Sequence, residues 1–93
     1  MQTAVRYKRV YVDVHVSFDL DGKMRPQALV CTNGRIYEID RVLDVRPAYA
    51  EKAGGQGDRY RVRMHGVEKE LFFEHNPDMS SPCIGRWFVE AMV

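Results

Sequence analysis

The strongest pattern along the chain is an alternation of apolar and polar positions near the N-terminus. Between Arg9 and Phe18, four valines occupy every second position. A period of two places successive side chains on opposite faces of a strand, so the valines are expected to face a core. Residues 1–8 precede this pattern and are expected to form a flexible N-terminal arm.

Two glycine-containing turns follow this strand. Asp21-Gly22 predicts the first, because glycine adopts positive φ without strain and aspartate tolerates it. A second strand is expected over Gln27–Thr32, with Pro26 at its start, where the missing N–H does no harm. Asn33-Gly34 then predicts a two-residue type I′ turn, which would place Val30 opposite Tyr37.

The return strand of this hairpin is expected over Arg35–Arg46. Its apolar positions cannot all share one face at a strict period of two, so we expect a β-bulge or bend at Asp40-Arg41. Pro47 is expected to end the strand. The glycine-rich segment Pro47–Asp58 then predicts a loop.

A second hairpin is expected over Arg59–Glu74. A two-residue turn at His65-Gly66 would pair Met64 with Val67. The same register places Arg63 opposite Glu68 and Arg61 opposite Glu70, and these opposite charges on one face favour it over its neighbours.

The rest of the chain comprises a loop at Asn76–Pro82 and an apolar segment, Gly85–Val93. We interpret the segment as a closing strand, with a short helix from Arg86 as the alternative. Together, the predicted strands and turns indicate an all-β fold, an antiparallel curled sheet or small barrel of five to six short strands. Its predicted core comprises Val10, Val12, Val14, Val16, either Leu29 or Val30, either Ile36 or Tyr37, Val42, Leu43, Tyr60, Val62, Leu71, Phe73 and Trp87.

Composition narrows the class of protein. A chain of 93 residues is the size of one domain, so we expect residues 1–93 to fold as one unit. The net charge of +1 excludes a histone-like polycation and an acidic tail protein. Only two cysteines are present, and no apolar stretch is long enough to cross a membrane. These features predict a cytoplasmic protein without membrane contact.

No arrangement of residues indicates catalysis or metal binding. The histidines at 15, 65 and 75 stand apart, and none forms a zinc-type pair with Cys31 or Cys83. His75, Asp78 and Cys83 lie near one another in sequence, but within a loop that lacks a nucleophile motif. We therefore expect no enzymatic activity, no catalytic residues, no metal and no cofactor.

Arginine and aromatic residues alternate in several segments. This combination is typical of small β-domains that stack bases on aromatic rings and hold phosphates with arginine. The candidate binding surface comprises Arg35, Tyr37, Arg59, Arg61, Arg86 and Trp87. We expect a non-catalytic interaction module with a protein partner or a second copy of itself; the alternative is a nucleic-acid-binding accessory domain.

A sequence resemblance covers residues 26–90. It rests on Pro26, Gly34-Arg35-Ile36-Tyr37, Val42-Leu43-Asp44, Arg59-Tyr60-Arg61-Val62, Gly66, Glu70-Leu71-Phe72 and Arg86-Trp87-Phe88-Val89-Glu90. In this order the residues resemble a family of small bacterial all-β domains of unassigned function. Some members of that family are associated with translesion DNA polymerase accessory proteins. The resemblance implies a β-fold of unassigned function and no catalytic residues.

Overall fold

The computed structural model of this chain describes residues 7–49, 56–78 and 80–92. Every helix or strand in those ranges is a β-strand, which confirms the predicted all-β class. The strands are β1 (Tyr7–Phe18), β2 (Met24–Val30), β3 (Ile36–Glu38), β4 (Arg41–Tyr49), β5 (Gln56–Met64), β6 (Val67–His75) and β7 (Gly85–Met92). Tyr7 and Lys8 therefore belong to β1, and the rest of the predicted arm lies outside the described residues.

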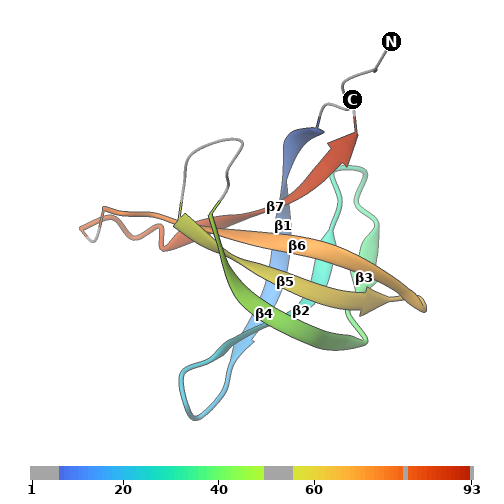
Figure 1. Ribbon diagram of the computed structural model, residues 1–93, viewed down its shortest axis with the longest axis horizontal. Helices are drawn as coiled ribbons and strands as arrows, with labels where there is room; N and C mark the ends of the chain where they lie inside the picture. Colours follow the sequence, from blue (N-terminus) through green and yellow to red (C-terminus); the bar gives the residue numbers. More distant parts are fainter. Residues whose placement is uncertain (1–6, 50–55, 79, 93) are drawn as a thin grey trace.

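The strands form one antiparallel sheet in the order β3-β2-β1-β7-β6-β5-β4. Although β3 and β4 lie at opposite edges, only Ile39 and Asp40 separate them in the chain. The sheet curls into a half-barrel, so its two edge strands, β3 and β4, come together at Ile39 and Asp40 (Figure 1). The N–H of Ile39 donates to Gln27 on β2, whereas the N–H of Asp40 donates to Arg63 on β5. The predicted return strand thus changes partners here, which accounts for seven strands where five to six were expected.

The first two hairpins share one turn geometry. The N–H of Gly22 donates to the carbonyl of Asp19, and the N–H of Gly34 donates to that of Cys31. Both glycines have positive φ, 79° and 84°. Each turn is therefore a three-residue loop that ends in a left-handed glycine. The two-residue turn predicted at Asn33-Gly34 is wrong.

The longer turn shifts the β2–β3 register by one residue. Tyr37 pairs with Leu29, and Ile36 pairs with Val30. Because paired residues share a face, Leu29 and Tyr37 both point inward, and Ile36 is 61% exposed. Of the alternatives left open for the core, Leu29 and Tyr37 are therefore the ones that face inward.

β2 begins earlier than predicted. Pro26 lies inside the strand and is buried, although the sequence placed it at the strand start. It pairs with Val16 beside a register shift, where the ladder is already interrupted. A proline is tolerated in a strand at such a bulge, because no ladder hydrogen bond depends on its nitrogen.

The bulge in the return strand lies later than predicted. Val42 pairs with Val62 and Asp44 pairs with Arg61, so Leu43 is the extra residue. Pro47 does not end β4, which continues to Tyr49 along the edge of the sheet, where proline is tolerated. Residues 47–49 and 56–58 of the predicted loop are therefore strand; residues 50–55 lie outside the described residues.

The second hairpin confirms its predicted register. Met64 pairs with Val67, and Arg63 pairs with Glu68. His65 and Gly66 both have positive φ, 50° and 75°, as a type I′ turn requires. The closing segment is likewise the predicted strand, β7, and not a helix.

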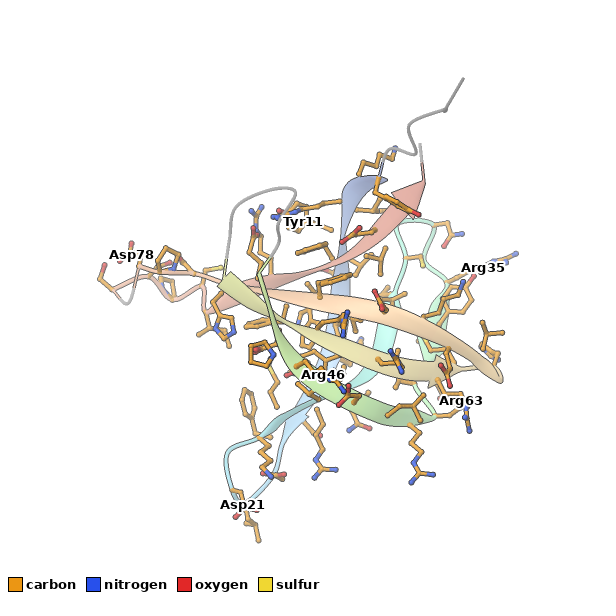
Figure 2. The ribbon with its side chains drawn as sticks, in the orientation of Figure 1. Tyr11, Asp21, Arg35, Arg46, Arg63 and Asp78 are labelled. Atoms are coloured by element: carbon orange, nitrogen blue, oxygen red, sulfur yellow. The ribbon has the colours of Figure 1, made fainter. Side chains whose placement is uncertain are left out.

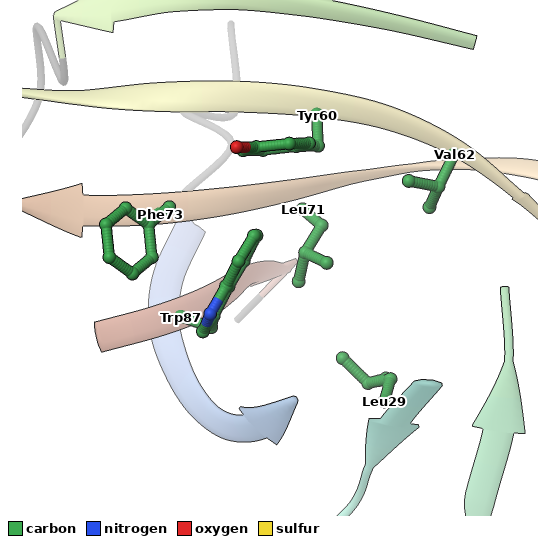
Figure 3. Close-up of a cluster of buried hydrophobic side chains, with 6 residues drawn as sticks. All are labelled: Leu29, Tyr60, Val62, Leu71, Phe73 and Trp87. Carbon is green, nitrogen blue, oxygen red and sulfur yellow. The ribbon is translucent and has the colours of Figure 1, made fainter. Parts of the chain in front are cut away.

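The core lies inside the curl, between β5–β7 and β2 (Figure 3). Its buried members are Leu29, Tyr60, Val62, Leu71, Phe73 and Trp87. Val62 and Leu71 are almost wholly buried, and each such side chain contributes about 1.5–3 kcal/mol. Val12 and Val14 pack against this cluster, as predicted, but Val16 is 36% exposed because the β1–β2 hairpin extends past the curled sheet (Figure 1).

Candidate functional site

The outer face of β4 and β5 is rich in arginine. Val62 points inward with no exposed surface, so its neighbours Arg61 and Arg63 point outward. Direct pairing brings three further residues to the same face: Arg41 is opposite Arg63, Asp44 is opposite Arg61, and Arg46 is opposite Arg59. Two like-charge pairs therefore flank a single Asp–Arg pair. We call these five arginines (41, 46, 59, 61 and 63) the arginine face; Arg46 and Arg63 are labelled in Figure 2.

The bulge at Leu43 creates this face. Arg41 and Arg46 are five positions apart, so at a strict period of two they would point to opposite sides of β4. The extra residue at Leu43 resets the alternation and turns both side chains outward.

Acidic neighbours neutralise the arginine face only in part. Arg46 forms an ion pair of 2.7 Å with Asp44. Arg59 and Arg63 lie 3.9 Å from Glu70 and 4.0 Å from Glu68, distances at the limit of an ion pair. In the described part of the chain, neither Arg41 nor Arg61 has an ion pair.

A cluster of aromatic rings continues the outer face over β6, β7 and β1. Phe72 and Phe88 stack with their centroids 5.1 Å apart and their planes at 7°. Tyr11 meets Phe88 edge-on at 5.8 Å, and the Arg86 guanidinium lies 4.1 Å above the Tyr11 ring. Phe88 is only 4% exposed, because the guanidinium of Arg9 lies over its ring at 4.6 Å.

Glu74 connects the charged groups of this cluster. Its Oε1 accepts from Arg9 Nη1 at 2.6 Å, and its Oε2 accepts from the Tyr11 hydroxyl and from Arg86, both at 3.1 Å. Partial burial works to lower the pKa of Arg9, but the hydrogen bond to Tyr11 and the charge of Glu74 together raise it. Arg9 therefore stays charged, although its Nη2 is buried and has no hydrogen-bond acceptor among the residues that the structure describes.

The six candidate residues named from the sequence do not share one surface. Arg59, Arg61 and Arg86 lie on the outer face of β5 and β7. Trp87 is buried inside the curl, and Tyr37 packs against the same core. Arg35 is exposed at the turn before β3, outside both the arginine face and the aromatic cluster (Figure 2).

Sequence reasoning missed two groups on the outer face. Nothing in the sequence predicted that Arg41 and Arg46 share a face, because that depends on the bulge at Leu43. Tyr11, Phe72 and Phe88 are absent from the candidate binding surface named from the sequence. The alternation of Trp87 with Phe88 was a usable signal, since two adjacent aromatics on a strand must lie on opposite faces.

His75, Asp78 and Cys83 lie at the end of β6 and in the loop that follows it. His75 Nε2 lies 2.9 Å from Asp58, and Asp78 accepts hydrogen bonds from Ser80. Hydrogen bonding to Ser80 lowers the pKa of Asp78, so its carboxylate stabilises the turn. Cys83 is an exposed free thiol. Within residues 7–49, 56–78 and 80–92, no three metal-ligating side chains gather, and no helix has the length and apolarity to span a membrane.

Comparisons of this chain with protein-family models, with curated proteins and with solved structures found no match.

Proposed function

We propose that this chain is a non-catalytic binding module whose outer face recognises nucleic acid. The observation that carries the proposal is the direct opposition of Arg41 to Arg63 and of Arg46 to Arg59. Like charges opposite each other on a sheet are destabilising, so the folded protein bears a cost for this arrangement. A polyanion laid across the face relieves the repulsion and accepts hydrogen bonds from the same guanidinium groups.

The distribution of charge supports a localised interface. The chain as a whole carries only +1, but five of its arginines lie on the outer face of two neighbouring strands. Phosphate contacts carry no direct sequence information, so the proposed binding is largely independent of sequence.

The experiment is a fluorescence anisotropy titration of the full chain with a labelled oligonucleotide over a series of salt concentrations. Arg41→Ala and Arg61→Ala are the informative variants, because neither arginine holds an ion pair in the described residues. Each is expected to weaken binding and to reduce the slope of log K against log salt by about 0.7 for single strands. Arg35→Ala is the matched control, because its exposed side chain lies outside the arginine face.

The outcomes separate the candidate ligands. Affinity that falls steeply with salt, and falls further in the two arginine-face variants only, supports the proposal. Absence of binding at low salt contradicts it. Equal binding to vesicles of anionic phospholipid identifies a general affinity for phosphate surfaces and also contradicts a nucleic-acid function.

Self-association is a second candidate function, favoured by the β1–β2 hairpin. Phe18 and Leu20, at and beyond the end of β1, are 60% and 107% exposed, and Val16 is 36% exposed. Such apolar groups at the tip of a protruding hairpin are typical of a contact site. Sedimentation velocity over a range of concentrations tests it: a dimer that Phe18→Ser disrupts supports this function, and a monomer at all concentrations contradicts it.

A further inference from the structure

One row of directly paired residues crosses five strands on the outer face. Arg46 pairs with Arg59, Arg59 with Phe72, Phe72 with Phe88, and Phe88 with Tyr11. Neighbouring strands lie about 4.8 Å apart, so the row extends about 19 Å across β4, β5, β6, β7 and β1. Its chemistry changes along this length, from guanidinium groups on β4 and β5 to aromatic rings on the other three strands.

The aromatic end of the row presents an accessible stacking surface. Phe88 is covered, but Tyr11 is 38% exposed and the Arg86 side chain stacked on it is 61% exposed. A guanidinium is planar, so the side facing away from Tyr11 offers a second flat surface. Hydrogen bonds hold both groups: Glu74 accepts from the Tyr11 hydroxyl and from Arg86.

We infer that a single strand of nucleic acid crosses the sheet along this row. Its phosphates contact the arginine face, of which Arg46 and Arg59 lie in the row itself, and one of its bases stacks on the surface formed by Tyr11 and Arg86. The inference rests on the proposed nucleic-acid function and specifies its substrate. Single strands are the substrate because a duplex stacks its bases on one another and withholds their flat faces, whereas an unpaired base can stack on an aromatic ring or a guanidinium.

The test compares three labelled ligands with the full chain at one salt concentration. They are a twelve-residue oligothymidylate, an abasic deoxyribose-phosphate strand of the same length, and a duplex of the same length. The oligothymidylate is expected to bind on the order of tenfold more tightly than the abasic strand, the effect of one stacked base. Tyr11→Leu is expected to remove that difference and to leave the affinity for the abasic strand unchanged.

Two further variants control the result. Tyr11→Phe keeps the ring and loses only the hydroxyl, so it is expected to retain the preference for the base-containing strand. Phe18→Leu removes a 60% exposed ring remote from the row and is expected to change nothing. If Tyr11→Leu fails to fold, Arg86→Ala takes its place, because that side chain lies at the surface. This variant also removes one positive charge, so it is expected to weaken binding of both strands, and the loss of the preference for the base-containing strand is its readout.

Each outcome is decisive. Equal affinity for the abasic strand and the oligothymidylate overturns base stacking but leaves the proposed nucleic-acid function intact. Tighter binding of the duplex overturns the single-strand substrate. Absence of binding to all three ligands overturns the proposed function itself.

Discussion

Arg9 on β1 and Glu74 on β6 form an ion pair of 2.6 Å across the intervening strand β7. Their side chains are only 19% and 22% exposed, although both lie on the outer face of the sheet. The pair lies beside Phe88, over whose ring the Arg9 guanidinium is stacked. It therefore holds three strands together on the side of the sheet opposite the core.

Replacing Arg9 is expected to destabilise the fold. Arg9→Met uncovers the charge of Glu74 and loses the charge-assisted hydrogen bond, at a cost of about 1–3 kcal/mol in the free energy of unfolding. Arg46→Met removes the Arg46–Asp44 pair, in which the arginine is 68% exposed, and is expected to cost less than about 1 kcal/mol. Urea denaturation of both variants measures the difference. Equal losses would show that the Arg9 pair is no stronger than a surface contact.

Replacing Arg41, which lies opposite Arg63, is expected to raise the stability of the protein and to weaken its binding of nucleic acid. Arg41→Glu places a carboxylate directly opposite Arg63 and is expected to raise the free energy of unfolding by about 0.2–1 kcal/mol. The same change is expected to weaken oligonucleotide binding, since it adds negative charge to the arginine face. Denaturation and anisotropy on the same preparation measure both effects, with Arg35→Glu as the control. A loss of stability in Arg41→Glu would contradict a repulsion between Arg41 and Arg63.

Gly85 is required by close packing and not by backbone conformation. An added Cβ would lie 2.5 Å from Cζ of Phe73 and closer still to the carbonyl of Glu74. Gly85→Ala is therefore expected to cost about 1–3 kcal/mol and to displace the Phe73 ring. Because Phe73 packs 4.9 Å from Trp87, the only tryptophan, the emission of that residue should change.

Gly34→Ala provides the contrast. Nothing lies within 4 Å of an added Cβ at this turn, so the cost arises only from its φ of +84° and is about 1 kcal/mol. Its tryptophan emission is expected to match that of the wild type. An unchanged emission spectrum in Gly85→Ala as well would refute the contact with Phe73.

Stability at alkaline pH is expected to depend on Tyr60. Burial raises the pKa of Tyr60 above its ordinary value of 10.0, and the charge of Asp58 raises it further. The folded protein thus holds the phenolic proton more tightly than the unfolded chain. This contribution is fully present below pH 10 and is lost as the pH rises through the raised pKa.

The measurement compares the free energy of unfolding of the wild type and Tyr60→Phe between about pH 8 and pH 11. The wild type is expected to lose more stability over this range, because the variant has no phenol to ionise. Parallel curves for the two proteins would rule out a raised pKa at this position.

Turn chemistry explains which hairpin register the sequence could predict. At His65-Gly66 a two-residue turn allows only one register, and the opposite charges on the flanking strands favour the same register. At Asn33-Gly34 the same kind of signal failed, because Gly34 alone has positive φ and the loop contains a third residue. A dipeptide does not specify which of its residues becomes left-handed, so the register of β2 with β3 could not be predicted locally.

The candidate site was predictable only in part, for a related reason. Outward arginines at alternate positions of β5 follow from the sequence as soon as Val62 is assigned to the core. Their opposition to Arg41 and Arg46 does not, because it depends on the bulge at Leu43. The burial of Phe88 depends on Arg9, a residue far away in sequence whose guanidinium reaches it only when β1 pairs with β7.

The sequence by itself determined the all-β class, the register of the β5–β6 hairpin and most of the core, because a period of two and turn residues act over short distances. Tertiary structure decided the rest: the change of partner at Ile39 and Asp40, and the row from Arg46 to Tyr11. Both depend on which strands lie side by side. The strands acquire these neighbours only when the sheet curls around one shared core, and no local segment of the chain specifies that arrangement.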